Sequence, residues 1–205
     1  PSVDQTSDAA DEMDAFFGNV TLSDFTVTVV DGIPLPIYTG LAVDFGYRRM
    51  VLHYALLCAL AASESQNPQN LKTFYVGTEL VGINRVRDEN GVYVGTAHLN
   101  TLIDEVRALF DSYGLTDTEV SYAADWSEYH SHQDGTGDLN FPLDTIWSNP
   151  NCGHIAIDNY LPISDWRDGT DHDDYGTGVD VYGRPKAVTI YDLAYLKGQV
   201  EGGEY

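Results

Sequence analysis

Three acidic residues each close an apolar run of β-favouring residues. Glu79 ends Phe-Tyr-Val-Gly-Thr-Glu, Asp125 ends Val-Ser-Tyr-Ala-Ala-Asp, and Asp158 ends His-Ile-Ala-Ile-Asp. Side chains just past the carboxyl ends of parallel strands line the functional edge of an α/β protein. Hydrolysis of a glycosidic bond needs two carboxyl groups, one of them a proton donor. The spacing therefore makes Glu79 the candidate catalytic acid, and Asp125 and Asp158 candidate ligands of sugar hydroxyls.

Aromatic residues follow these acids closely. Trp126, Tyr160 and Trp166 offer flat apolar faces on which pyranose rings could stack, and we take them as candidate substrate-binding residues. The alternative is structural, because acids and aromatic residues at strand ends also cap loops and fill the end of a barrel. The pattern by itself favours this structural interpretation, since a fold does not imply a function.

The segments around the acids alternate between strand and helix. Apolar residues recur with helical spacing over 47–62, before the run that ends at Glu79, and over 96–113, between the runs that end at Glu79 and Asp125. This alternation is typical of βα units with a parallel sheet. Four further elements are expected: a helix capped by Thr6 or Ser7 and running to about Phe17, with Met13, Phe16 and Phe17 facing the core, an edge strand over 27–30, and short helices over 142–147 and 191–197.

The composition limits the class of partner. The chain of 205 residues has 10 Lys and Arg against 32 Asp and Glu, a formal net charge of -22. Such a charge repels phosphate backbones and anionic lipid surfaces, so we expect no direct binding of nucleic acid. No apolar run approaches the length of a membrane-spanning helix, and the first residues lack the features of a signal peptide. We expect one domain made in the cytoplasm, and the missing initiator Met suggests a segment of a longer product.

Histidines and acids invite a metal-site interpretation. His130 and His132 precede an acidic run over 168–174, within a glycine-rich loop expected over 165–183. The run matches neither an EF-hand loop nor an HExxH motif, so an exposed loop is favoured over a calcium site. No P-loop, GxSxG or strand-to-helix GxGxxG is present. Cys58 lies on the apolar face of a predicted helix and is expected to be a buried free thiol. We therefore predict no metal and no cofactor.

Several long stretches resemble one known domain. They include Tyr-Arg-Arg-Met-Val-Leu-His-Tyr-Ala at 47–55 and Val-Gly-Thr-Glu-Leu at 76–80. The remaining stretches are 121–129, 157–162, 164–169, 195–198 and 201–204. From about Met13 onward the chain resembles the glycoside-hydrolase-like TIM-barrel domain of the large tail protein of gene transfer agents and related alphaproteobacterial tailed phages.

The resemblance implies a fold and a setting. The fold is an α/β protein of the (β/α)8 TIM-barrel type, like a glycoside hydrolase, with about units three to six of the barrel present. The setting is the tail tip or baseplate hub of a phage-like particle, assembled with other tail proteins in the bacterial cytoplasm and present in the virion. There the barrel would engage cell-envelope glycan during DNA delivery.

The resemblance also implies a catalytic position. Glu79 matches the acid/base glutamate of retaining glycosidases, and the second catalytic carboxylate of the family falls beyond this sequence. The chain is accordingly either a glycan-binding module or an active retaining glycosidase that cuts peptidoglycan or surface polysaccharide. A polysaccharide-degrading enzyme unconnected to any particle is a third alternative.

Overall fold

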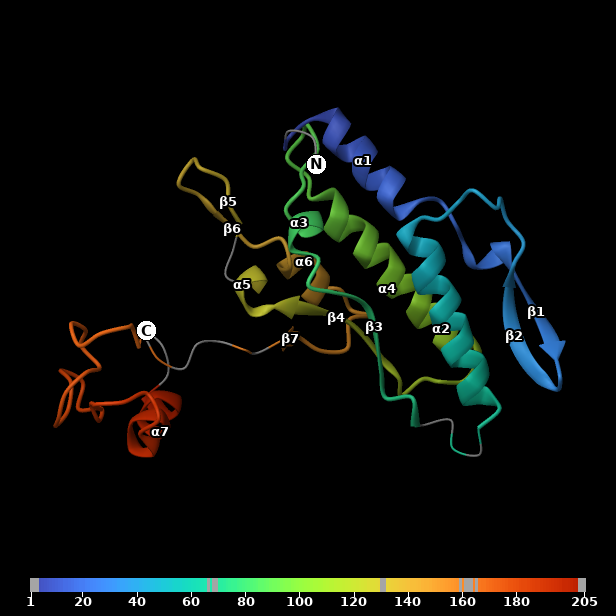
Figure 1. The fold of residues 1–205 in the computed structure, drawn as a ribbon. Coiled ribbons are helices and arrows are strands. Elements are labelled where there is room, and N and C mark those ends of the chain that lie inside the picture. Colours follow the sequence, from blue (N-terminus) through green and yellow to red (C-terminus); the bar gives the residue numbers. More distant parts are fainter. Residues whose placement is uncertain are drawn as a thin grey trace. The chain divides into compact units, whose positions relative to one another are not determined.

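A computed structural model describes residues 4–65, 67, 70–129, 132–158, 160, 164 and 166–202; for residues 201 and 202 it describes the backbone alone. Figure 1 shows the order of its elements along the chain. The helices are α1 (Ser7–Phe17), the 3-10 turn η1 (Leu22–Asp24), α2 (Tyr47–Ser63), α3 (Val81–Asn84), α4 (Val94–Ser112), α5 (Trp126–Tyr129), α6 (Asp144–Trp147) and α7 (Leu193–Gly202). The strands are β1 (Phe25–Val30), β2 (Ile33–Tyr38), β3 (Thr73–Thr78), β4 (Glu119–Asp125), β5 (His132–Gln133), β6 (Leu139–Asn140) and β7 (Ala156–Asp158).

The chain divides into two compact units. The first, Pro1–Asn159, holds every element except α7, and the second, Tyr160–Tyr205, holds α7 and the loop before it. All three candidate acids lie in the first unit. The expectation of one domain over the whole chain stays a prediction, and each unit is described by itself below.

The first unit is built on a parallel sheet. Its strand order is β3-β4-β7, and both pairs of neighbours run parallel. The predicted βα alternation is thus confirmed: α4 connects β3 to β4, and α6 precedes β7. Among the described residues these three strands remain an open sheet and do not close into a barrel.

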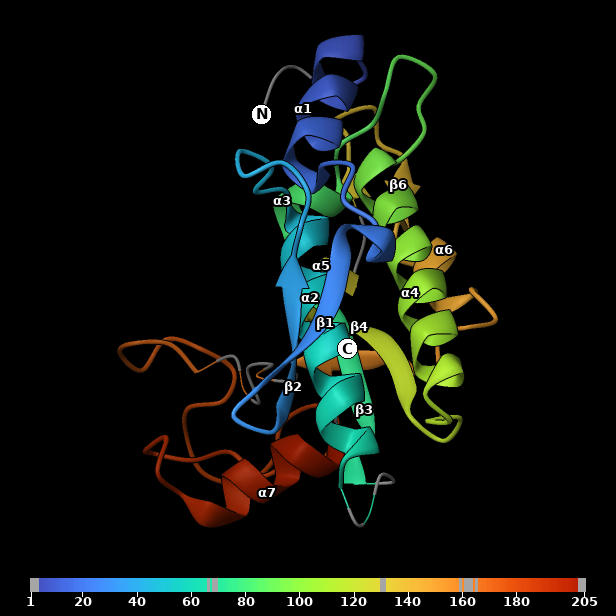
Figure 2. The ribbon, with the colours of Figure 1, turned by 90° about the vertical axis from the view of Figure 1, so that its right-hand side faces the viewer.

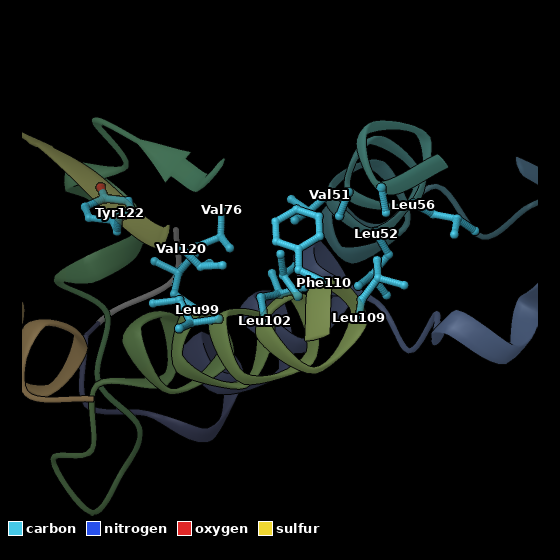
Figure 3. Close-up of a cluster of buried hydrophobic side chains, with 14 of the residues drawn as sticks. Val51, Leu52, Leu56, Val76, Leu99, Leu102, Leu109, Phe110, Val120 and Tyr122 are labelled. Atoms are coloured by element: carbon cyan, nitrogen blue, oxygen red, sulfur yellow. The ribbon is translucent and has the colours of Figure 1, made fainter. Parts of the chain in front are cut away.

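One hydrophobic core joins the sheet to its helices. Helix α4 packs on β3, β4, α2 and α6, and Figure 2 shows α2 and α4 on neighbouring paths. Figure 3 draws part of this core: Val51, Leu52 and Leu56 from α2, Leu99, Leu102, Leu109 and Phe110 from α4, and Val76, Val120 and Tyr122 from the sheet. Burying each such aliphatic or Phe side chain contributes roughly 1.5–3 kcal/mol. The apolar spacing that predicted the two helices is therefore the spacing that faces the core.

The amino-terminal helix begins as predicted but faces the core differently. The side chain of Thr6 caps α1 by accepting the N–H of Ala9 at 3.2 Å. Met13 and Phe17 are buried, as expected, whereas Phe16 is 38% exposed, so its assignment to the core was wrong. Phe16 instead stacks on the ring of Tyr47, with the centroids 5.3 Å apart. Adjacent helical residues point about 100° apart, so Phe16 and Phe17 cannot both face the same core.

The extended region after α1 is a hairpin rather than one edge strand. Strand β1 pairs antiparallel with β2, and the turn residues Asp31 and Gly32 have φ values of 52° and 82°. Asp-Gly with both φ values positive is the preferred two-residue hairpin turn. The sequence analysis missed β2 because it contains Pro34 and Pro36, and proline is rare in strands. Edge strands nevertheless tolerate proline.

Candidate functional site

Glu79 lies at the carboxyl end of β3 in an unusual backbone conformation. Its φ is 53°, in the left-handed region that side chains other than Gly rarely occupy. Its N–H donates to the carbonyl of Ala123 in β4 at 2.9 Å. The β3–β4 register shifts between Tyr75 and Thr78, and β3 ends at Thr78, directly before Glu79. Glu79 therefore follows the strand directly, at the carboxyl edge of the sheet, where the sequence analysis predicted it.

Gly77 makes this irregular step possible. A Cβ at Gly77 would lie 2.8 Å from the hydroxyl oxygen of Tyr47 and 3.0 Å from Cδ1 of Leu80. The Tyr47 hydroxyl also donates to the carbonyl of Val76 at 3.0 Å. A larger residue at position 77 would therefore have to displace Tyr47, which joins helix α2 to the end of β3.

Glu79 and Asp158 form a contact between two carboxyl groups. Their side chains are hydrogen-bonded, and Thr78 also donates to Asp158 Oδ2 at 3.2 Å. Desolvation by the surrounding protein raises the pKa of Glu79 above the usual value of a glutamate, and the charges of Asp158 and Asp125 raise it further. The contact places two acidic side chains against each other, and repulsion by the charge of Asp158 favours the neutral form of Glu79. The edge of the sheet thus presents two neighbouring carboxyl groups, and the pKa of Glu79 is raised there.

Asp125 pairs with Asp158 in the β4–β7 register, so the structure brings all three predicted acids to one edge. Asp125 is buried, and its Oδ1 accepts the backbone N–H of Ser127 at 2.7 Å and also the Ser127 hydroxyl. This contact ties the first turn of α5 to the end of β4. These contacts of Asp125 are those of a cap. They agree with the structural interpretation, in which acids at strand ends cap the segments that follow, rather than with the binding of sugar hydroxyls.

The sequence analysis did not select Glu128, whose carboxylate is hydrogen-bonded to Tyr122 and Asp125 at this edge of the sheet. Glu128 is 2% exposed, and it accepts hydrogen bonds from Asn84 Nδ2 at 2.5 Å, from the Tyr122 hydroxyl at 2.8 Å and from the Asp125 N–H at 3.2 Å. Burial raises the pKa of Glu128, and these hydrogen bonds oppose the rise. The pattern Asp125-x-x-Glu128 is the capping-box spacing. From this spacing alone, a role for Glu128 at the end of β4 could have been predicted.

The three candidate aromatic residues separate into two groups. Trp126 follows Asp125 directly in α5 and is half-buried in the same unit as the acids. Tyr160 and Trp166 belong to the second unit, where Tyr160 is exposed. Trp166 packs edge-on against His172 and Tyr195, with ring centroids 4.8 and 5.6 Å away. Trp126 is therefore the one predicted aromatic residue that the structure groups with the acids.

The residues of the metal-site interpretation belong to different units of the chain. His132 contacts the Tyr93 hydroxyl at 3.2 Å in the first unit, the run 168–174 lies in the second, and His130 falls outside the described residues. Across the part of the chain that the structure describes, no group of three or more His, Cys, Asp or Glu side chains is placed to hold a metal ion.

Two other sequence expectations concern the cysteines and the membrane. Cys58 and Cys152 are both free thiols; Cys58 is half-buried, and burial raises its pKa. None of the helices in the described ranges is long and apolar enough to span a membrane.

Comparison with known proteins gives one match. A family model described as the GTA TIM-barrel-like domain matches residues 45–205. No curated protein and no solved structure matches the chain. The matched region begins just before α2 and includes every candidate site residue, while α1 and the β1–β2 hairpin precede it.

Proposed function

This chain belongs to the family of GTA TIM-barrel-like domains, and from that membership we propose that it is a module of the tail tip or baseplate hub of a gene-transfer-agent or related phage particle. In this proposal its strand-end acids bind cell-envelope glycan while DNA is delivered. The other tail proteins are its partners, and the virion is its location.

The observation that carries the proposal is the contact between Glu79 and Asp158, with Asp125 beside them, at the carboxyl edge of a parallel sheet. Ligands of α/β proteins bind at that edge. Carboxyl oxygens accept hydrogen bonds from hydroxyl groups, so the pair offers several acceptors to the hydroxyls of a sugar. Trp126 adds an aromatic face on the same unit. Neutral, hydroxyl-rich glycan is a better match than an anionic ligand for a chain of net charge -22.

Binding is tested with the full chain and insoluble envelope fractions. Co-sedimentation with purified peptidoglycan and with surface polysaccharide should give saturable binding, which Glu79→Gln weakens. Glu89→Gln is the matched control, because Glu89 is an exposed glutamate in the turn before α4. Equal binding by the two variants would remove Glu79 from the proposed site, and no binding by the unaltered chain would overturn the glycan proposal.

The particle setting is tested separately. Mass spectrometry of purified particles should detect this polypeptide, and its gene should lie among tail genes. Its absence from the particles, with no tail genes nearby, would favour the alternative of an unattached polysaccharide-degrading enzyme.

The raised pKa of Glu79 favours a second candidate function, a retaining glycosidase with Glu79 as acid/base, because a general acid must stay protonated near working pH. A retaining enzyme holds its two carboxyl groups about 5 Å apart. Asp158 is hydrogen-bonded to Glu79 and raises its pKa, and we assign it this role rather than that of the nucleophile. Release of soluble sugars from envelope glycan by the complete protein, abolished in Glu79→Gln, would establish catalysis. Full activity in Glu79→Gln would exclude this role.

A further inference from the structure

Glu128 is a charged residue in an interior position. It lies in the four-residue helix α5 and is 2% exposed. Acidic side chains are almost never fully buried unless they are paired or hydrogen-bonded, since burying an ionised carboxylate is costly. Three donors meet Glu128 instead of a counter-charge: the Asn84 amide, the Tyr122 hydroxyl and the Asp125 N–H. The position therefore has a specific use for a carboxylate with several acceptor sites.

The first use is at Glu79. The Tyr122 hydroxyl donates to Glu128 and at the same time accepts the N–H of Leu80 at 2.6 Å. Leu80 follows Glu79, whose own N–H is bonded to the Ala123 carbonyl. The peptide groups on both sides of the Glu79 Cα are thus tied to β4. A left-handed conformation at a residue other than Gly is strained and persists only where the surroundings hold it.

The second use is at Asp125. Oε2 of Glu128 accepts the Asp125 N–H at 3.2 Å, while the Asp125 side chain caps α5, the helix that carries Glu128. These reciprocal contacts form a closed loop of the capping-box kind. One buried carboxylate therefore connects the ends of β3 and β4, from which Glu79 and Asp125 project.

We propose that Glu128 is a positioning residue that acts through Tyr122 to hold Glu79 against Asp158, and through the Asp125 backbone to hold the neighbouring strand end. Glu128 does not touch the ligand. The inference rests on the proposed function for what the acids bind, whereas the positioning itself is independent of any ligand.

The test replaces single hydrogen-bonding groups and leaves volume nearly unchanged. Tyr122→Phe removes the acceptor of the Leu80 N–H and a donor to Glu128, and Glu128→Gln removes one acceptor site of the carboxylate. Amide hydrogen exchange in the full chain reports on Leu80, and a carbon-detected NMR titration reports on the Glu79 carboxyl group. Tyr75→Phe is the matched control, because it removes a hydroxyl of the same sheet that contacts His154 and not this network.

We expect Leu80 to exchange about tenfold faster or more in Tyr122→Phe, as for the loss of one buried hydrogen bond. In both variants the pKa of Glu79 should fall toward that of an ordinary glutamate, because its contact with Asp158 loosens. Tyr75→Phe should change neither quantity. Binding of purified peptidoglycan should weaken at least about fivefold in both variants, since a buried hydrogen bond is lost.

An unchanged pKa of Glu79 and unchanged Leu80 exchange in both variants would overturn the inference. So would failure of both variants to fold, because the network would then stabilise the fold as a whole. Absence of glycan binding by the unaltered chain would overturn the proposed function alone, since the exchange and titration results do not depend on a ligand.

Discussion

The guanidinium of Arg48 lies 2.7 Å, through Nη2, from both carboxylate oxygens of Glu105, and so ties α2 to α4. Arg48 is buried, and its Nε also donates to the Val20 carbonyl at 3.0 Å. A buried cation that loses its partner is costly, whereas an exposed ion pair contributes little. This pair therefore holds together the two helices that cover the sheet.

Glu105→Gln should lower the free energy of unfolding by about 1–3 kcal/mol, less than for a fully buried pair because the Glu105 side chain is 31% exposed. Urea unfolding measures the change. The control is Asp111→Asn, which removes the more exposed pair between Arg107 and Asp111 within α4 and should cost under about 0.5 kcal/mol. Equal losses in the two variants would contradict a special role for Arg48.

Gly77→Ala should destabilise the first unit by roughly 1–3 kcal/mol, because the added Cβ meets the Tyr47 hydroxyl at 2.8 Å. Gly82→Ala in α3 is the control, since nothing lies within 4 Å of its Cβ position and alanine favours a helix. Thermal unfolding of both variants checks the prediction. Tolerance of Gly77→Ala would show that Tyr47 moves aside without cost.

Asp158→Asn should lower the pKa of Glu79, because it removes the negative charge with the larger effect on Glu79 and replaces the carboxyl group hydrogen-bonded to it. Asp125→Asn should lower it by less, since Asp125 acts only through its charge. NMR titration of the Glu79 carboxyl group measures both shifts. The reverse order would mean that Asp125, not Asp158, is the closer partner.

Stability should depend on pH through Glu79. Its pKa is raised in the folded state, so its contribution is fully present below the unfolded-chain value near 4.5 and is lost as the pH rises through the folded-state pKa. Glu79→Gln removes this loss, and the variant should gain stability relative to the unaltered chain as pH rises through that window. The pKa of Glu128 is also raised, so part of the dependence of stability on pH remains in Glu79→Gln. Urea unfolding from acidic to neutral pH checks this, with Glu89→Gln as control; parallel curves for all three proteins would contradict it.

Features that depend on neighbours in the chain were predictable from the sequence. The apolar spacing predicted α2 and α4 within two residues of their ends, and Thr6 was correctly placed among the candidate caps of α1. The strand ends at Glu79, Asp125 and Asp158 were also found, since a run of β-favouring residues that ends on an acid is a local pattern. Parallel strands bring their carboxyl ends together, so the grouping of these acids followed from the pattern as well.

Tertiary structure decided what each acid does, because that depends on residues distant in sequence. The Glu79–Asp158 contact, the left-handed backbone at Glu79 and the burial of Glu128 all arise where β3, β4, β7 and α5 meet. The capping-box spacing Asp125-x-x-Glu128 is a local sign that Asp125 is a cap, but no local pattern identifies Asp158 as the partner of Glu79. The sequence by itself determined which residues reach the edge of the sheet. Packing then determined which donors and charges surround each carboxylate, because a pKa and a hydrogen bond depend on distances that only the folded chain sets.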